Sequence, residues 1–160
     1  LKNIFIESKS NEPTLNWTIN WTGVDYKFYA INNYNDIYFV NYNDYFIEFD
    51  GWQIVKVNGF LPNNAIEIKI ESQSMNFIEN KKIISTAICT PWSKSLINYN
   101  KYLRYDQVCE GENFEYNFKN SIIINDLNQI IGLKYKVNPN YPAILIIMNE
   151  YNKIQLSLNQ

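Results

Sequence analysis

The sequence predicts an all-β domain, mostly antiparallel, built from hairpins and meanders as a β-sandwich or a partly open barrel with little helix. About ten short apolar segments are separated by turn residues at intervals of roughly eight to twelve positions. No stretch of the sequence shows a long helical periodicity. Because 46% of the 160 residues are apolar and only 19% are charged, the chain is expected to fold as a single β-rich domain over residues 1–160.

A three-stranded meander over residues 35–59 is the clearest element of this prediction. Asn43-Asp44 and Asp50-Gly51 lie between apolar runs, where each pair predicts a two-residue turn. Glycine accepts a positive φ without strain and aspartate tolerates it, so Asp-Gly is the stronger of the two signals. Together the two turns predict the register of all three strands.

In that register, residues that lie opposite each other share one face of the sheet. The predicted cross-strand partners are Val40 with Ile47, Tyr38 with Phe49, Phe49 with Trp52, and Ile47 with Ile54. The face that is expected to be buried contains Tyr38, Val40, Tyr42, Tyr45, Ile47, Phe49, Trp52 and Ile54. Phe39 and Phe46 fall on the opposite face, and Tyr135 lies between two lysines. These three aromatic residues are candidate contacts for a glycan or a partner protein.

Further strands are expected on both sides of the meander. Trp17, Ile19 and Trp21 alternate with polar residues and predict a strand that ends at Gly23. Strand patterns also occur at 26–31, 65–71, 83–88, 114–118, 121–125, 130–137, 143–148 and 154–158. The run 143–148 is apolar throughout, which is typical of a central strand that is buried on both faces.

Two segments have less regular patterns. Residues 72–82 are polar and are expected to form a loop or one helical turn. In residues 93–104, Leu96, Tyr99 and Leu103 have helical spacing, whereas the end of the segment has the composition of a strand. We favour a strand for this second segment because its surroundings are β.

Cys89 and Cys109 are the two cysteines of the chain. Two cysteines are too few for a disulfide scaffold, and their spacing matches no zinc-binding pattern. They form one bridge if the protein is exported, which requires Cα atoms within about 7 Å of each other. The alternative is two separate buried thiols, since free cysteine is among the most buried residue types.

The sequence contains no histidine, which excludes Ser-His-Asp and Cys-His catalytic arrangements and histidine-based metal sites. Its five scattered glycines form no phosphate-binding loop. The spacing of Glu110, Glu112 and Glu115 favours a strand with a solvated face over a calcium site or a pair of catalytic carboxylates. The sequence therefore predicts a protein that is not an enzyme and has no metal or cofactor.

Charge and hydropathy exclude two further classes. The net charge is −2 and no long basic run occurs, so nucleic-acid binding is not expected. No run of about 18 apolar residues is present, so no membrane span is expected. The sequence begins at Leu1 without a leader, which is consistent with the mature form of an exported protein.

Two segments share an order of elements with a bacterial family. Residues 38–61 give a strand, a short turn, a strand, a glycine turn and a third strand that leads to a loop with Gly and Leu. Residues 109–151 give a cysteine, an acidic residue, an aromatic strand, an Asp turn, prolines and a closing apolar strand. The residues of this second match are Cys109, Glu110, Phe118, Asp126, Gly132, Pro139 and Pro142. In both segments the chain resembles the YjbF-like or group 4 capsule polysaccharide lipoproteins (GfcB-like), as a divergent member with Trp52 where the family carries a basic residue.

The resemblance implies a periplasmic, outer-membrane-anchored lipoprotein whose lipid anchor lies upstream of Leu1. It implies a non-enzymatic accessory role in the export or assembly of capsular polysaccharide or exopolysaccharide, with the export machinery or the polysaccharide as partner. One alternative is a structural or adhesion subunit of a larger assembly from an AT-rich genome, which the outward aromatics and the surplus of Asn, Ile, Tyr and Lys favour. Another is a carbohydrate-active enzyme that uses carboxylates among Glu110, Glu112 and Glu115. The sequence leaves the oligomeric state open.

Overall fold

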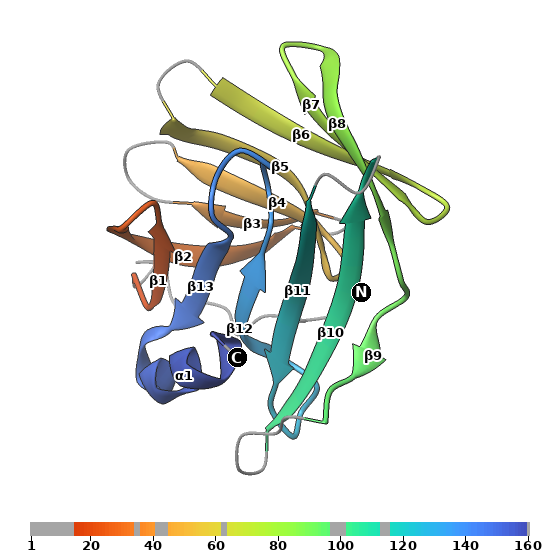
Figure 1. Cartoon of the computed structure of the whole chain (residues 1–160). Helices are drawn as coiled ribbons and strands as arrows, with labels where there is room; N and C mark the ends of the chain where they lie inside the picture. Colours follow the sequence, from red (N-terminus) through yellow and green to blue (C-terminus); the bar gives the residue numbers. More distant parts are fainter. Residues whose placement is uncertain are drawn as a thin grey trace.

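The computed structural model describes residues 15–33, 36–40, 45–61, 64–96, 102–112 and 116–159. These residues form a single antiparallel sheet of thirteen strands that curls around one core (Figure 1). The strands are β1 (Trp17–Trp21), β2 (Val24–Asn33), β3 (Asp36–Val40), β4 (Phe46–Asp50), β5 (Gln53–Leu61), β6 (Asn64–Glu71), β7 (Ser74–Glu79), β8 (Lys82–Cys89), β9 (Ser93–Lys94), β10 (Leu103–Gly111), β11 (Asn117–Ile124), β12 (Ile130–Tyr135) and β13 (Ile144–Met148). The all-β prediction is confirmed, and the single curled sheet resembles a partly open barrel more than a two-layered sandwich.

The order of strands explains the curl. From β11 the sheet continues through β12, β13 and β1, and then through β2 to β8 in sequence order. β8 pairs with β10, and β10 pairs on its other edge with β11, so the hydrogen-bonded ladder returns to its starting strand. The inner face of this sheet contains one large apolar cluster, in which Trp17, Ile19 and Phe28 are completely buried. The predicted alternation of Trp17, Ile19 and Trp21 is therefore confirmed.

The meander has a register that differs from the predicted one. Asp50 pairs with Gln53, so the turn residues are Gly51 and Trp52, and Gly51 has a positive φ of 60°. Glycine thus occupies the first of the two turn positions, as in a type II′ turn, and Phe49 lies opposite Ile54 instead of Trp52. The central expectation of a shared buried face holds here, because Ile47, Phe49 and Ile54 are all buried.

The first hairpin is also shifted by one residue. β3 pairs with β4 so that Phe39 lies opposite Ile47 and Ile37 lies opposite Phe49. The prediction that Val40 faces Ile47 is therefore wrong. The expected turn at Asn43-Asp44 lies outside the described residues.

The polar segment 72–82 forms strand β7, so the prediction of a loop or helical turn is wrong. Met75 and Phe77 alternate with polar residues and are buried in the core, with exposed fractions of 1% and 0%. Asn80 and Lys81 both have positive φ and form the turn to β8. The segment 93–104 contains β9 and the start of β10, so its described part is β as expected, while residues 97–101 lie outside the description.

The C-terminal segment is helical, which corrects the prediction of a final strand at 154–158. A 3-10 helix, η2 (Asn149–Ile154), leads directly into α1 (Gln155–Leu158). Ile154 and Leu158 are four residues apart and pack on the outer face of the sheet; the other buried residues of this second cluster are Ile123, Ile131, Leu145 and Ile147. β13 therefore has apolar contacts on both of its faces, as its sequence predicts. No helix in the described residues is both long and apolar enough to cross a membrane.

Candidate functional site

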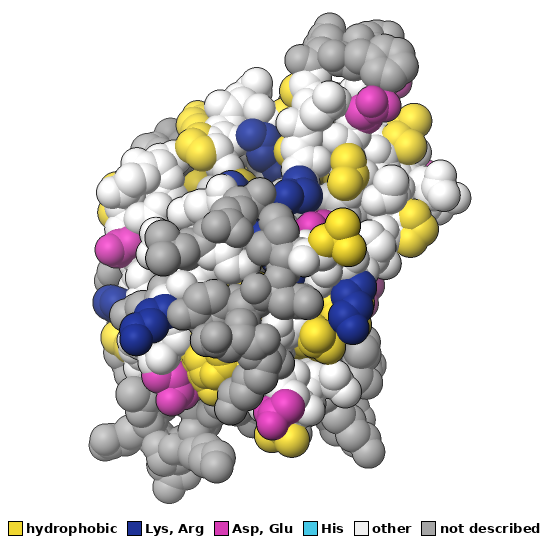
Figure 2. Space-filling model, turned by 60° about the horizontal axis from the view of Figure 1, so that its bottom comes forward, with side chains coloured by type: hydrophobic (Ala, Val, Ile, Leu, Met, Phe, Trp, Pro, Cys, Tyr) yellow, Lys and Arg dark blue, Asp and Glu magenta, His cyan; other side chains and the backbone are white. Residues whose placement is uncertain are grey.

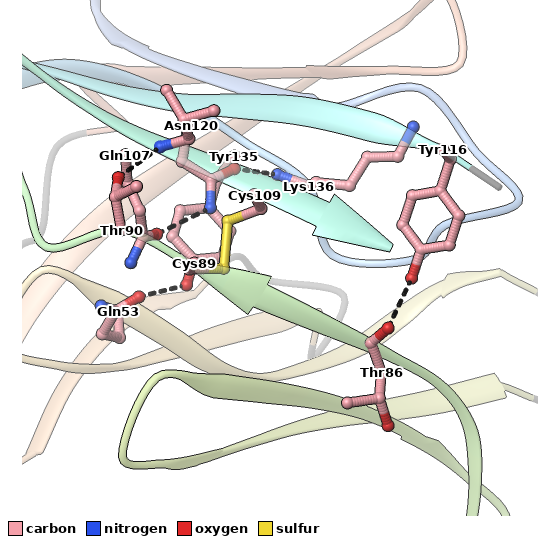
Figure 3. Close-up of a disulfide and its surroundings, with 11 residues drawn as sticks. Gln53, Thr86, Cys89, Thr90, Gln107, Cys109, Tyr116, Asn120, Tyr135 and Lys136 are labelled. Atoms are coloured by element: carbon pink, nitrogen blue, oxygen red, sulfur yellow. Dashed lines mark hydrogen bonds between the residues drawn. A yellow bond between two sulfur atoms is a disulfide. The ribbon is translucent and has the colours of Figure 1, made fainter. Parts of the chain in front are cut away.

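A disulfide joins β8 to β10 (Figure 3). Cys89 and Cys109 lie opposite each other in the ladder with Cα atoms 4.1 Å apart, and both side chains are buried. Of the two alternatives that the sequence left open, the structure contains the bridge. Because the bond joins directly paired residues of neighbouring strands, it fixes the last residue of β8 against β10.

The chain departs from β10 immediately after the disulfide and then returns to it. The amide N–H of Thr90 donates to the carbonyl oxygen of Val108 (2.8 Å), and the N–H of Val108 donates to Thr90 Oγ1 (3.0 Å). Pro91 follows, and since it has no N–H it cannot extend the ladder. The pairing resumes where Ser93 lies opposite Asp106. Three residues of one strand, 90–92, therefore lie against two of the other, 107–108, which is the geometry of a bulge and displaces Trp92 from the ladder.

Trp92 packs against two further aromatic residues. Its ring is 5.8 Å from that of Trp52 between centroids, in an edge-to-face arrangement at 88°. The ring centroid of Trp52 is in turn 5.1 Å from that of Tyr105. The indole Nε1–H of Trp92 is buried and has no acceptor among the described residues. A buried donor without an acceptor costs about 1–3 kcal/mol, so this group is unsatisfied in the structure as it stands.

A pocket of about 310 Å³ lies beside Trp92 and the disulfide, within the size range of small-molecule sites. Its lining residues are Gln53, Ile70, Ser72, Gln73, Ser74, Met75, Cys89, Thr90, Pro91, Trp92 and Gln107. None of these side chains carries a charge. The lining instead combines an aromatic ring with amide and hydroxyl groups.

Two glutamines of the pocket accept hydrogen bonds from side chains that are not part of the pocket lining (Figure 3). The Tyr135 hydroxyl donates to Gln53 Oε1 (2.5 Å), and Asn120 Nδ2 donates to Gln107 Oε1 (3.1 Å). Asn120 is fixed in its turn, because its Oδ1 accepts from the backbone N–H of Lys136 (2.8 Å). Neither of the two bonds uses the NH₂ group of its glutamine, so each amide retains donors for a ligand.

The pocket suits an uncharged polar ligand. Aromatic rings present an apolar face, while amides and hydroxyls donate and accept hydrogen bonds. Sugars combine the same two properties, because their rings have apolar C–H faces bordered by hydroxyl groups. The arrangement of a partly buried tryptophan and several fixed amides can therefore hold a neutral sugar residue.

Of the three aromatic candidates from the sequence, Tyr135 and Phe46 do not line this pocket. Tyr135 is completely buried and burial raises the pKa of its phenol, so it has no surface to offer a glycan directly. It lies behind the pocket and positions Gln53. Phe46 is half-buried, with the Lys56 ammonium 5.9 Å from its ring centroid. The side chain of Phe39 lies outside the described residues.

Sequence reasoning missed Trp92, Gln53 and Gln107. Their only local signal is Pro91-Trp92 directly after Cys89, which does not reveal a pocket without the pairing of the strands. Of the acidic cluster, Glu110 and Glu112 are exposed and Glu115 lies outside the description. Within the described residues, no group of three or more His, Cys, Asp or Glu side chains is placed to hold a metal.

The sequence matches no family model and no curated protein. Among solved structures, the fold is similar to that of the hypothetical lipoprotein YmcC of Escherichia coli K12. The TM-score is 0.60 at 8% sequence identity, and the alignment covers 82% of this chain and 80% of that protein. The similarity therefore extends over most of both chains and shows a common fold.

Proposed function

We propose that this chain is the β domain of an exported, outer-membrane-anchored lipoprotein that assists the export or assembly of a capsular polysaccharide or exopolysaccharide. In this proposal the domain binds the glycan without catalysis and holds a neutral sugar residue in the pocket beside Trp92. The observation that carries the proposal is the lining of that pocket, which joins the Trp92 ring to the amides of Gln53 and Gln107 and has no charged side chain among the described residues.

Two observations support export. The Cys89–Cys109 bridge belongs to the kind of bond that persists in oxidising compartments such as the bacterial periplasm. The similar structure from E. coli is that of a hypothetical lipoprotein, and the likeness spans 82% of this chain. The order of elements in 38–61 and 109–151 adds the resemblance to capsule lipoproteins on which the polysaccharide role rests.

A binding role is favoured over catalysis by the chemistry of the pocket. Among the described residues that line it there is no acid, base or free thiol, since Cys89 is in the disulfide. General acid–base catalysis requires a titratable group within hydrogen-bonding reach of the substrate. The hydroxyls of Ser72, Ser74 and Thr90 have no histidine anywhere in the sequence to activate them.

Binding is tested by isothermal titration of the purified domain with neutral dextran oligosaccharides and with capsular polysaccharide from the organism that encodes the chain. Trp92→Phe keeps an aromatic ring but removes the N–H donor, and we expect it to weaken binding. Leu127→Ala is the matched control, because Leu127 is 72% exposed on the β11–β12 turn. Phe46→Ala tests whether the glycan instead binds at Phe46, the aromatic contact that the sequence suggested. If Trp92→Phe binds as well as Leu127→Ala, or Phe46→Ala alone loses binding, the pocket is not the site.

Export is tested by expressing the full-length gene in a bacterium with radioactive palmitate. We expect a cysteine acceptor in the gene shortly before Leu1, label in the protein, and recovery in the outer-membrane fraction. A protein that stays unlabelled in the cytosol would contradict the lipoprotein part of the proposal but not sugar binding.

A second candidate is an interaction subunit of a larger assembly. Ile88 and Val108 are 58% and 51% exposed, and both line a shallow hollow of about 440 Å³ on the outer side of the disulfide. Apolar side chains are also exposed among scattered charges on the face shown in Figure 2. Sedimentation of the isolated domain distinguishes the two candidate functions. An obligate subunit would associate, whereas a glycan-binding domain needs no protein partner.

A further inference from the structure

We propose that the outer face of β11 and β12 carries a second site, which binds the anionic substituents of the glycan through Lys119, Lys134 and Lys136. The substituents are carboxylate or phosphate groups on successive sugar residues. The inference rests on the proposed function for the nature of the chain that carries the anions. The lysine site is separate from the Trp92 pocket, so each can be tested without the other.

The register of the sheet gathers these lysines on one face. Ser121 lies opposite Lys134; Lys119 precedes Ser121 by two residues on β11, and Lys136 follows Lys134 by two, one residue after the end of β12. Residues two apart on a strand point to the same face. That face is the outer one, because the intervening Tyr135 is buried in the core.

The three lysines border a hollow of about 290 Å³ next to the C-terminal helix. Its lining residues are Phe118, Lys119, Ser121, Lys134, Lys136, Ala143, Leu158 and Asn159. Lys134 and Lys136 are both half-buried rather than fully extended into solvent. The site is thus a recess on the outer face and not a set of isolated surface charges.

The carboxylate of Asp106, which is bonded to Ser121 of this face, is also engaged by Arg104. Asp106 Oδ1 accepts hydrogen bonds from Arg104 Nε (2.9 Å) and Ser121 Oγ (2.7 Å). Within the described residues, no carboxylate lies within ion-pairing distance of Lys134 or Lys136. Lys134 and Lys136 therefore carry positive charge that no described carboxylate neutralises through an ion pair.

This positive charge raises the energy of the unliganded site. Burial and the neighbouring charge of Lys134 lower the pKa of Lys136. Like charges close together on one face of a sheet repel each other. An anion in the hollow would relieve this repulsion.

The spacing of the lysines favours a polyanion over a single small ion. Lys134 and Lys136 are two residues apart at the end of β12, a spacing of about 7 Å for extended backbone. A row of cations at that spacing can contact charges on successive units of a chain. The neutral lining of the Trp92 pocket complements this site, because one glycan chain can carry both uncharged and acidic sugar residues.

The test measures binding of polygalacturonate to the whole domain at low salt. Lys134→Gln/Lys136→Gln is compared with Lys82→Gln/Lys94→Gln, which removes the same net charge from exposed lysines on β8 and β9. We expect the first double variant to bind about tenfold more weakly or worse, with a shallower dependence on salt, because fewer counterions are released. The second should bind as the wild type does. Equal loss in both variants, or no loss in either, would overturn the proposal.

Three further binding measurements distinguish a glycan from other anionic ligands, and the lysine site from the Trp92 pocket. Inorganic phosphate should displace polygalacturonate only at concentrations well above that of the polymer's carboxylates, because the site contacts charges on successive units. Displacement by phosphate at a lower concentration than those carboxylates, or phosphatidylglycerol vesicles that bind while polygalacturonate does not, would contradict a glycan ligand. The affinity for neutral dextran should be the same in Lys134→Gln/Lys136→Gln as in the wild type. If Lys134→Gln/Lys136→Gln weakens polygalacturonate binding while Trp92→Phe leaves dextran binding unchanged, the lysine site is supported and the proposal of a sugar site beside Trp92 is wrong.

Discussion

Cys89 lies directly opposite Cys109 in the β8–β10 ladder, and their disulfide fixes the strand from which the Trp92 bulge departs. The bond closes a segment of 20 residues that also includes β9 and the start of β10. We expect Cys89→Ser/Cys109→Ser to lower the free energy of unfolding by about 3 kcal/mol, because the bridge restricts the unfolded chain. Urea denaturation measures this loss. A variant as stable as the wild type would show that the ladder alone holds β8 in place.

The loss of the disulfide should also affect binding more than stability alone predicts. Thr90, Pro91 and Trp92 follow the bridge directly, so a looser β8 end would let Trp92 move away from Gln107. We expect dextran affinity to fall under conditions where the double serine variant is still folded. Unchanged affinity would mean that the bulge is positioned by its hydrogen bonds to Val108 without the bridge.

Gly132 on β12 is in close contact with the side chain of Ile154 in η2. A Cβ at position 132 would overlap the Ile154 Cδ1 atom, so the end of that side chain would have to shift. We expect Gly132→Ala to cost about 1–3 kcal/mol of stability, as overpacking does. Ile154→Val in the same chain should recover part of this loss. A double-mutant cycle on thermal or urea unfolding measures the coupling, and purely additive effects would contradict the contact.

The ionisation of Asp106 should make the free energy of unfolding depend on pH in the acid range. Burial raises the pKa of its carboxyl, but hydrogen bonds from Ser121 and Arg104, with the charges of Arg104 and Lys119, lower it overall. A carboxyl whose pKa is lower in the folded state stabilises the protein above its ordinary pKa of about 3.9, and this contribution is lost as the pH falls further. We therefore expect wild type to lose more stability than Asp106→Asn between about pH 5 and pH 2. Parallel curves for the two proteins would contradict this pairing.

Tyr135 is predicted to act on binding through Gln53. Tyr135→Phe removes the donor to Gln53 Oε1 and should cost about 1 kcal/mol of stability, the usual net value of one hydrogen bond. The freed amide can then rotate, so dextran affinity should fall in this variant although Tyr135 does not line the pocket. Phe28→Leu, a substitution in the same core, provides a control for general destabilisation. If both variants lose affinity equally, Tyr135 has no specific positioning role.

The alternation of apolar and polar residues predicted the fold class because it depends only on neighbours in sequence. It succeeded where one strand face is strictly apolar, as in Trp17–Trp21. It failed for residues 154–158, where alternation and helical spacing occur together and contact with Gly132 accompanies the helical form. In the meander the Asp-Gly signal correctly predicted a two-residue turn, but Gly51 occupies the first turn position and not the second. The partner of Phe49 is therefore Ile54, two residues beyond the predicted Trp52.

The candidate site could not be predicted in the same way. Gln53, Trp92 and Gln107 come from the start of β5, the bulge before β9 and the middle of β10. Only the pairing of β8, β9 and β10 brings two of them together, and only the curl of the sheet adds the third. The cysteines were the one part of the site that the sequence singled out, and it left their bonding open.

The indole N–H signals of the protein report directly on sugar binding beside Trp92. The chain has four tryptophans, so a ¹⁵N–¹H correlation spectrum should contain four such signals, and Trp92→Phe assigns one of them. On addition of the neutral oligosaccharide that binds, the Trp92 signal should shift towards that of a hydrogen-bonded donor, while those of the fully buried Trp17 and Trp21 stay in place. A saturating oligosaccharide that leaves the Trp92 signal unmoved would contradict a sugar site beside the disulfide.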